Sequence, residues 1–327
     1  MGRAGGEGRV STGGMAETEV VRVGVVGVGY LGRFHAEKYA RMGGVRLAAV
    51  ADKEIERAYR VAEKTGASAF RDAEDLYPLV DAVSVAVPTT AHYEVARGFL
   101  DRGIDVLVEK PLAATLREAR DLVRRARTKG CILQVGHLER FNPVWKALRG
   151  ILVRPRFIEA HRLGPFQDRG TDVDVILDLM IHDIDVVLKY VPARLKAVES
   201  VGVPVLSANV DIANARLRFE DGSVANLTAS RVSAKRSRKI RFFQKDLYVS
   251  VDYDSRQIQV YQRTFNEQGV PEIVGSQHVA PAGDALEEEL KAFIESVRSR
   301  TKPEVDGEAG ERALEVATKI LQRVRSA

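Results

Sequence analysis

The sequence contains very little cysteine and no long apolar run. Cys131 is the single cysteine in 327 residues, so no disulfide can form within the chain, and a reducing, cytoplasmic location is the simplest prediction. No apolar run approaches the roughly 20 residues that a membrane-spanning helix needs, which excludes an integral membrane protein. Disorder throughout is also excluded, because 45% of the residues are hydrophobic and can bury a core. The net charge of +5 suits an anionic small substrate as well as a nucleic acid.

The length predicts about two domains, at roughly 150 residues for each. Residues 1–19 begin with a Gly-rich stretch that cannot pack, so we predict a disordered tail there, with Met15 as an alternative start of translation. The pattern of apolar residues changes near residue 138. We therefore place one domain at 20–138 and a second at 139–327.

The first domain shows short apolar runs that alternate with amphipathic helical segments. The runs are rich in Val, Ile and Ala and are unbroken, which is typical of strands that are buried on both faces. They lie at 21–26, 47–51, 82–87, 105–108 and 132–135, and the helical segments lie at 33–41, 54–64, 93–102 and 115–129. This alternation predicts an α/β fold with a doubly wound parallel sheet.

The second domain is predicted to be α+β, with a large, mostly antiparallel open sheet. Many of its strands alternate apolar with polar residues, which indicates one wet face. Strands are predicted at 156–162, 197–203, 213–219, 224–233, 240–243, 247–251 and 257–261, and helices at 143–152, 174–190, 286–300 and 310–324. Glu220-Asp221-Gly222 predicts a hairpin turn. The last helix is a candidate to pack back on the first domain.

A Gly-rich motif directly follows the first strand and opens the first helix. Gly27-Val28-Gly29-Tyr30-Leu31-Gly32 fits G-x-G-x-x-G, and Asp52 ends the next strand twenty positions later. The first glycine permits a tight turn, the second lets the backbone approach a pyrophosphate, and the third lets helix and strand pack closely. The helix N-terminus then faces the phosphates, so we predict a Rossmann dinucleotide site. Asp52 favours NAD over NADP because it would repel a 2′-phosphate, although Lys53 weakens that preference.

A lysine ends a buried strand at the edge where ligands of such sheets bind. Val108-Glu109-Lys110-Pro111 places Lys110 over the expected nicotinamide cleft, where desolvation lowers the pKa of a lysine. Pro111 is a candidate for a cis peptide bond that would fix the direction of the lysine. The alternative is a surface Glu–Lys pair at the end of the strand.

The predicted helix at 174–190 carries three polar residues among apolar ones. Asp178, His182 and Asp185 have offsets of 0, 4 and 7, which places them on one face of an α-helix. Asp178 can orient and charge-stabilise His182, and a histidine held in this way is a candidate general base. A metal centre would need a third good ligand with an open position, so we predict no metal.

Four motifs in this order resemble the Gfo/Idh/MocA oxidoreductase family, from about residue 20 to the C-terminus. They are the glycine motif at 27–32, Val87-Pro88-Thr89 with His92, Glu109-Lys110-Pro111, and Asp178-x-x-x-His182-x-x-Asp185. The resemblance implies that the first three motifs bind the cofactor and that Lys110, His182 and Asp178 carry the chemistry on the substrate. The family often has glycine where this chain has Met180, and we expect that difference to reshape the pocket.

A narrower resemblance points to the bacterial UDP-N-acetylglucosamine 3-dehydrogenase branch of that family. It is carried by His137-Leu138-Glu139-Arg140-Phe141-Asn142-Pro143, Gly170-Thr171-Asp172-Val173-Asp174 and Leu227-Thr228-Ala229-Ser230-Arg231. It implies oxidation of the sugar 3-hydroxyl, which lets an aminotransferase install a 3-amino group for lipid A. His182 would take the proton and Lys110 would bind the same oxygen, and the choice of base between them stays open. Another sugar, an inositol or a UDP-sugar uronate is an alternative substrate, and a non-catalytic NAD sensor is an alternative class.

Further substrate contacts are predicted at Arg140 and Asn142, which follow the last strand of the first domain. An ion pair with Glu139 or a domain-interface contact is the alternative for Arg140.

The segment at 231–241 has six basic residues and no acid. A solvated hairpin is the default there, and Arg231 and Lys235 are the best candidates for a diphosphate cradle. A nucleic acid is disfavoured, because no base-stacking platform adjoins the run.

Exposed apolar sheet faces mark interfaces between subunits, so we expect a homodimer or homotetramer through the C-terminal sheet.

Overall fold

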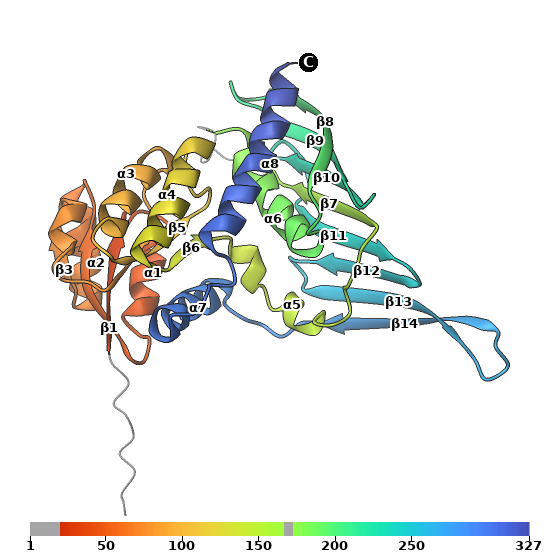
Figure 1. Cartoon of the computed structure of the whole chain (residues 1–327), viewed down its shortest axis with the longest axis horizontal. Helices are drawn as coiled ribbons and strands as arrows, with labels where there is room; N and C mark the ends of the chain where they lie inside the picture. Colours follow the sequence, from red (N-terminus) through yellow and green to blue (C-terminus); the bar gives the residue numbers. More distant parts are fainter. Residues whose placement is uncertain (1–19, 167–172, 327) are drawn as a thin grey trace, which may run out of the picture.

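The computed structural model describes residues 20–166 and 173–326, and it contains two sheets that lie side by side (Figure 1). The predicted tail at 1–19 lies outside the described residues, as do the first three residues of the motif at 170–174. None of the described helices is long and apolar enough to cross a membrane.

The first sheet is parallel throughout and has the strand order β3-β2-β1-β4-β5-β6. Its strands are β1 (Val21–Val26), β2 (Val45–Ala51), β3 (Ser68–Phe70), β4 (Ala82–Val85), β5 (Asp105–Glu109) and β6 (Leu133–Gly136). The helices between them are α1 (Gly32–Tyr39), α2 (Ile55–Thr65), η1 (Ala73–Leu76), α3 (Thr89–Leu100) and α4 (Leu116–Lys129). Local sequence sets these bounds. For example, α4 begins with a capping box between Thr115 and Glu118 and ends at Gly130, which has a φ of 65°.

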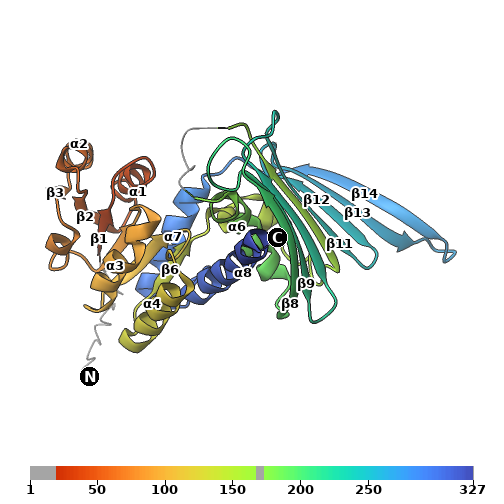
Figure 2. The same ribbon diagram turned by 90° about the horizontal axis from the view of Figure 1, so that it is seen from above.

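The second sheet has eight strands in the order β14-β13-β12-β11-β7-β10-β9-β8, and only β7 and β10 pair in parallel. The strands are β7 (Phe157–Leu163), β8 (Leu195–Val203), β9 (Ile212–Phe219), β10 (Val224–Ser230), β11 (Ser237–Gln244), β12 (Leu247–Asp252), β13 (Gln257–Phe265) and β14 (Pro271–Val279). The predicted hairpin turn joins β9 to β10, with Gly222 at a φ of 82°. Helices cover one face of this sheet (Figure 2).

Several predicted elements differ from the observed ones. The helix predicted at 143–152 is only α5 (Val144–Ala147), and it follows the short η2 (Leu138–Phe141). The helix predicted at 174–190 is a π-helical turn, η3 (Ile176–Met180), that continues into α6 (Ile181–Tyr190). The strands β3 and β14 were not predicted.

Two C-terminal helices connect the sheets. Helix α7 (Ala285–Ser299) packs against α1 and η2, whereas α8 (Gly307–Arg325) packs against α4 and β6 on one side and α6 and β8 on the other (Figure 1). The prediction of a parallel doubly wound sheet followed by a large, mostly antiparallel sheet is confirmed.

Candidate active site

The glycine motif forms the tight turn between β1 and α1. Gly27 has a φ of +83°, which favours glycine, and a Cβ on Gly32 would lie 1.8 Å from the carbonyl oxygen of Gly27. A Cβ on Gly29 would meet nothing closer than Arg57 Nη1 at 3.9 Å, so this side of the turn is open. No side chain caps the N-terminus of α1 at Leu31, so side chains leave this end open to an anion, although the Arg33 and Phe34 amides donate to the Gly29 and Leu31 carbonyls. The exposed ring of Tyr30 lies beside this turn.

Asp52 closes the same site from the end of β2. Its Oδ2 accepts a hydrogen bond from the Val28 amide at 3.0 Å, and its Oδ1 accepts one from the Glu54 amide at 2.9 Å. Because each carboxylate oxygen has two lone pairs, Asp52 can hold the turn and still accept from a ribose hydroxyl. Lys53 is exposed beside it. The turn, the open side at Gly29 and the carboxylate fit a dinucleotide.

His92 lies between two backbone carbonyls. Its side chain is buried, with Nδ1 at 2.8 Å from the Pro111 carbonyl oxygen and Nε2 at 2.9 Å from the Val87 carbonyl oxygen. Both partners are carbonyl oxygens, so the ring donates to only one of them while it is neutral, the state that burial favours by lowering its pKa. His92 thus braces two loops, and its predicted cofactor contact stays a prediction. Residues Val87, Pro88 and Thr89 lie at the carboxyl end of β4, where α3 begins.

Lys110 connects the two halves of the site. It follows β5, and the Lys110–Pro111 peptide bond is cis, as predicted. The Lys110 ammonium donates to the backbone carbonyl of Asp178 at 2.7 Å and to Asp178 Oδ1 at 3.2 Å. The Asp178 carbonyl belongs to the π-helical turn η3, and such turns are frequent at functional sites.

The π-helical turn changes the predicted role of Asp178. α-Helical spacing does not hold across η3, and the Asp178 carboxylate is paired with Lys110 rather than with His182. Asp185 lies 3.7 Å from Arg140 Nε in an ion pair of its own. The expectation that Asp178 orients the imidazole therefore becomes an expectation that it positions Lys110.

His182 lies at the start of α6. Its Nδ1 is buried and has no hydrogen-bond partner among the described residues. Burial lowers the pKa of this imidazole well below its usual value, and the positive charges of Lys110 and Arg162 lower it further. The ring is thus neutral near pH 7, so one nitrogen keeps a lone pair, and the same lowered pKa makes it a weaker base than a free imidazole.

Glu109 points away from the predicted cofactor contact. Its carboxylate is buried, and Oε1 lies 3.1 Å from Nε2 of the buried His35 on α1. Glu289 on α7 is fully buried nearby, and neither of its carboxylate oxygens has a partner among the described residues. Burial raises the pKa of Glu289 well above its usual value, and the charge of Glu109 adds to that effect.

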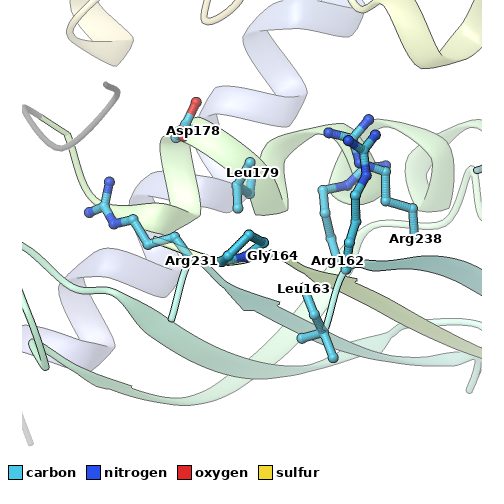
Figure 3. A pocket seen from close by; sticks show the side chains of 9 residues that line it. Arg162, Leu163, Gly164, Asp178, Leu179, Arg231 and Arg238 are labelled. Atoms are coloured by element: carbon cyan, nitrogen blue, oxygen red, sulfur yellow. The ribbon is translucent and has the colours of Figure 1, made fainter. Parts of the chain in front are cut away.

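A cavity of about 110 Å³ lies beside Asp178, between the second sheet and the start of η3 (Figure 3). Its charged lining residues are Asp178, Arg162, Arg231, Arg236 and Arg238. Lys235 is exposed and does not line this cavity, so the structure does not bring it to Asp178 as a diphosphate cradle would require.

Arg231 has an internal role in the second domain. Its Nε donates to Asp211 Oδ1 at 2.9 Å, and Nη2 donates to the carbonyls of Val173 and Val210. The side chain is buried at 6% exposure. We therefore correct the predicted substrate contact, because these bonds occupy the guanidinium.

Arg140 and Asn142 lie away from the cavity beside Asp178. Arg140 Nη2 donates to the Glu304 carbonyl at 3.2 Å, which joins the segment after β6 to the segment before α8. Asn142 Oδ1 accepts from the Val144 amide at 3.2 Å, in the turn that precedes α5. Both residues line a different cavity of about 390 Å³. The predicted pair of Arg140 with Glu139 is not formed, because Glu139 pairs with Arg162 at 2.9 Å.

Some residues of the site were not singled out from the sequence. His137, at the end of β6, is buried, and neither ring nitrogen has a partner among the described residues. Arg162 is buried on β7 beside the cavity. Met180 packs fully buried in the core under the second sheet and is not among the residues that line this cavity. Across the described ranges, no group of three His, Cys, Asp or Glu side chains could hold a metal ion.

Comparison with known proteins matches two family models to the two parts of the chain. The model described as an oxidoreductase family with an NAD-binding Rossmann fold covers residues 21–137, and the model of the GFO/IDH/MocA C-terminal domain covers 149–248. The fold and site define a Rossmann-fold oxidoreductase of the dehydrogenase type, which acts on a CH–OH group. The chain belongs to the Gfo/Idh/MocA family.

Individual relatives span nearly the whole chain. The UDP-N-acetylglucosamine 3-dehydrogenase of Acidithiobacillus ferrooxidans is 38% identical over 94% of this chain and 98% of its own, and its solved structure superposes with a TM-score of 0.88. The myo-inositol 2-dehydrogenase of Thermotoga maritima is 28% identical over the same shares of both chains. A solved probable dehydrogenase from Thermotoga maritima is 26% identical, with a TM-score of 0.79 over 94% of this chain and 97% of its own.

Proposed function

We propose that this enzyme oxidises the 3-hydroxyl of UDP-N-acetylglucosamine to a ketone with NAD. The observation that carries the proposal is the 38% identity to the Acidithiobacillus enzyme, which extends over 94% of this chain and 98% of that one. The arginine-lined cavity beside Asp178 supports a substrate that carries negative charge. Asp52 supports NAD over NADP, because a 2′-phosphate at the ribose would face its carboxylate.

The chemistry of the site follows from its charges. When bound, the nicotinamide ring supplies the hydride acceptor for the alcohol carbon. His182 takes the hydroxyl proton, since its imidazole is neutral, and Lys110 donates a hydrogen bond to the same oxygen. Negative charge that develops on that oxygen is stabilised by the ammonium group. Asp178 positions the lysine through its two contacts with Nζ.

The test is NADH formation, read by absorbance, with NAD, UDP-N-acetylglucosamine and hydroxylamine to trap the ketone. Lys110→Met and His182→Asn should each lose at least about 100-fold in rate if proton transfer and charge stabilisation are their roles. His161→Asn is the matched control, because His161 lies on β7 with its side chain 39% exposed. Near-normal turnover in both site variants would refute the assignment.

Substrate class is tested in the same assay. Myo-inositol, free N-acetylglucosamine and a UDP-sugar uronate replace the proposed substrate in parallel reactions. NADH formed from one of these and not from UDP-N-acetylglucosamine would transfer the proposal to that substrate. NAD binding without turnover of any of them would favour a cofactor-sensing regulator.

The cellular setting is proposed from the product. A 3-keto sugar nucleotide is the substrate that an aminotransferase needs to install a 3-amino group, so we propose coupling to such an enzyme in lipid A synthesis, in the cytoplasm and without nucleic acid. We also propose a homodimer or homotetramer through the C-terminal sheet. Its support is the exposed apolar surface of β13 and β14, where Phe265 is 61% and Ile273 is 78% exposed.

A further inference from the structure

We propose that Arg238 forms a subsite for the diphosphate group of the substrate, in the cavity that Arg162 also lines. The identity of the anion rests on the proposed function, whereas the existence of an anion subsite rests on the geometry of β7 and β11. This inference replaces the diphosphate cradle predicted at Arg231 and Lys235 with a different pair of residues.

The register of the second sheet places two arginines directly opposite each other. Arg238 on β11 is the cross-strand partner of Arg162 on β7. Figure 3 shows both side chains rising from neighbouring strands in the same direction, on the side where η3 and α6 lie. Like charges that face each other across a strand pair are destabilising. Arg162 pairs with Glu139 and Asp183, so the charge left without an ion-pair partner among the described residues is that of Arg238.

The carboxylates nearby are already used by other arginines. Asp183 accepts from Arg162 Nε at 3.0 Å and from Nη2 at 2.9 Å, and Glu139 accepts from Nη2 at 2.9 Å. Asp254 pairs with Arg236 at 2.9 Å.

Arg238 is the arginine of this cavity whose side chain has no ion pair or hydrogen bond to another described residue. Burial lowers the pKa of its guanidinium and the charges of Arg162 and Arg236 lower it further, while the more weakly acting charges of Glu139 and Asp254 raise it. A positive charge is thus held against both desolvation and like-charge repulsion, and a bound anion would relieve both. Arginine presents planar donors that match phosphate oxygens.

The cavity has the size of a subsite. Its volume of about 110 Å³ is below the roughly 300–1,000 Å³ of a complete ligand site, so it suits one group of a larger ligand. Asp178 lines the same cavity and contacts Lys110, so the anionic group would lie next to the reacting sugar. In a UDP-sugar, the diphosphate is attached directly to the sugar ring.

The alternation of β11 distinguishes Arg238 from its basic neighbours. Ile240 and Phe242 are buried in the core, and Arg238 has the same parity, so it points to the helix-covered face. Lys239 has the opposite parity, is exposed and pairs with Asp252 at 3.2 Å. Lys239→Gln is therefore a matched control for Arg238→Gln, one residue away on the opposite face.

The experiment is isothermal titration of the full-length protein with UDP, inorganic pyrophosphate and uridine. Arg238→Gln should weaken UDP and pyrophosphate binding by at least about 10-fold, which is about 1.4 kcal/mol, and leave uridine binding unchanged. Lys239→Gln should leave all three unchanged. Arg238→Lys keeps the positive charge and should recover part of the UDP affinity. Equal UDP affinity in wild type and Arg238→Gln would overturn the subsite.

Stability and turnover separate the remaining outcomes. Removal of an unpaired charge opposite Arg162 should leave the thermal midpoint equal or higher, and a large fall would overturn the subsite in favour of a structural role. UDP binding that depends on Arg238, without oxidation of UDP-N-acetylglucosamine, would support the subsite and refute the proposed function. Oxidation of UDP-N-acetylglucosamine with the same KM in wild type and Arg238→Gln would support the proposed function and refute the subsite.

Discussion

Glu289 should make the protein less stable as the pH rises from 5 to 7. Its carboxylate is fully buried on α7, without a partner among the described residues, and burial raises its pKa well above that of an exposed glutamate. Below the unfolded-state pKa of about 4.3, both states hold the proton and the residue has no effect. Above it, the unfolded chain releases the proton while the folded protein keeps it, so the free energy of unfolding falls until the pH reaches the folded-state pKa.

The size of the pH effect on stability follows from the single proton that the folded protein keeps on Glu289 and the unfolded chain releases. Stability should fall by about 1.4 kcal/mol for each pH unit over that range. Glu289→Gln removes the titration and keeps the shape of the side chain. The stability of the variant relative to wild type should therefore increase between pH 5 and pH 7, by at most about 2.7 kcal/mol, the effect of one proton over two pH units.

The assay is urea unfolding of both proteins at pH 5, 6 and 7 at constant ionic strength. Glu288→Gln is the control, because Glu288 is on the same helix, is paired with Lys146 at 2.8 Å and has a lowered pKa. Its effect should be the same at the three pH values, since it titrates below them. A difference between Glu289→Gln and wild type that does not change with pH would refute the reasoning, because it would mean that the folded protein ionises Glu289 normally.

Two further predictions separate binding from folding. Gly32→Ala should destabilise the protein even without cofactor, because its Cβ would lie 1.8 Å from the Gly27 carbonyl oxygen, whereas Gly29→Ala should leave the thermal midpoint unchanged and weaken NADH binding, read by fluorescence. Equal NADH affinity in Gly29→Ala and wild type would contradict this assignment. Arg231→Met should lower the free energy of unfolding by about 3–5 kcal/mol in urea, because it leaves Asp211 buried without its ion-pair partner. A loss below about 1 kcal/mol would return Arg231 to the list of ligand contacts.

Strands that are buried on both faces were predictable, and strands with little burial were not. The parallel sheet leaves unbroken apolar runs, because both faces of each strand pack against helices. By contrast, every residue of β14 is exposed, so no apolar alternation marks it, and its position follows from backbone pairing with β13. β3 has three residues, which is too short for a periodic pattern.

The candidate site also has parts that local sequence predicts and parts that only tertiary packing determines. The glycine motif and Lys110 were predicted from local patterns, because their positions depend on the adjacent strand ends. The partners of charged residues depend on tertiary packing: Arg162 pairs with Asp183, and Lys110 takes the Asp178 carboxylate that was expected to serve His182. A π-helical turn has no clear sequence signal, so the change of spacing at η3 was not anticipated. The catalytic roles of Lys110, His182 and Asp178 stay predictions.

The position of α8 has a consequence for synthesis on the ribosome. Leu314 belongs to the core cluster of the first sheet, and Ile320, less than two turns further along the same helix, belongs to the core of the second. Phe293 on α7 is also buried in the cluster that contains β1. The N-terminal sheet is translated first, but side chains near the end of the chain complete its core. The nascent chain therefore exposes apolar surface until Ile320 has emerged, and that interval is when it most needs protection from aggregation.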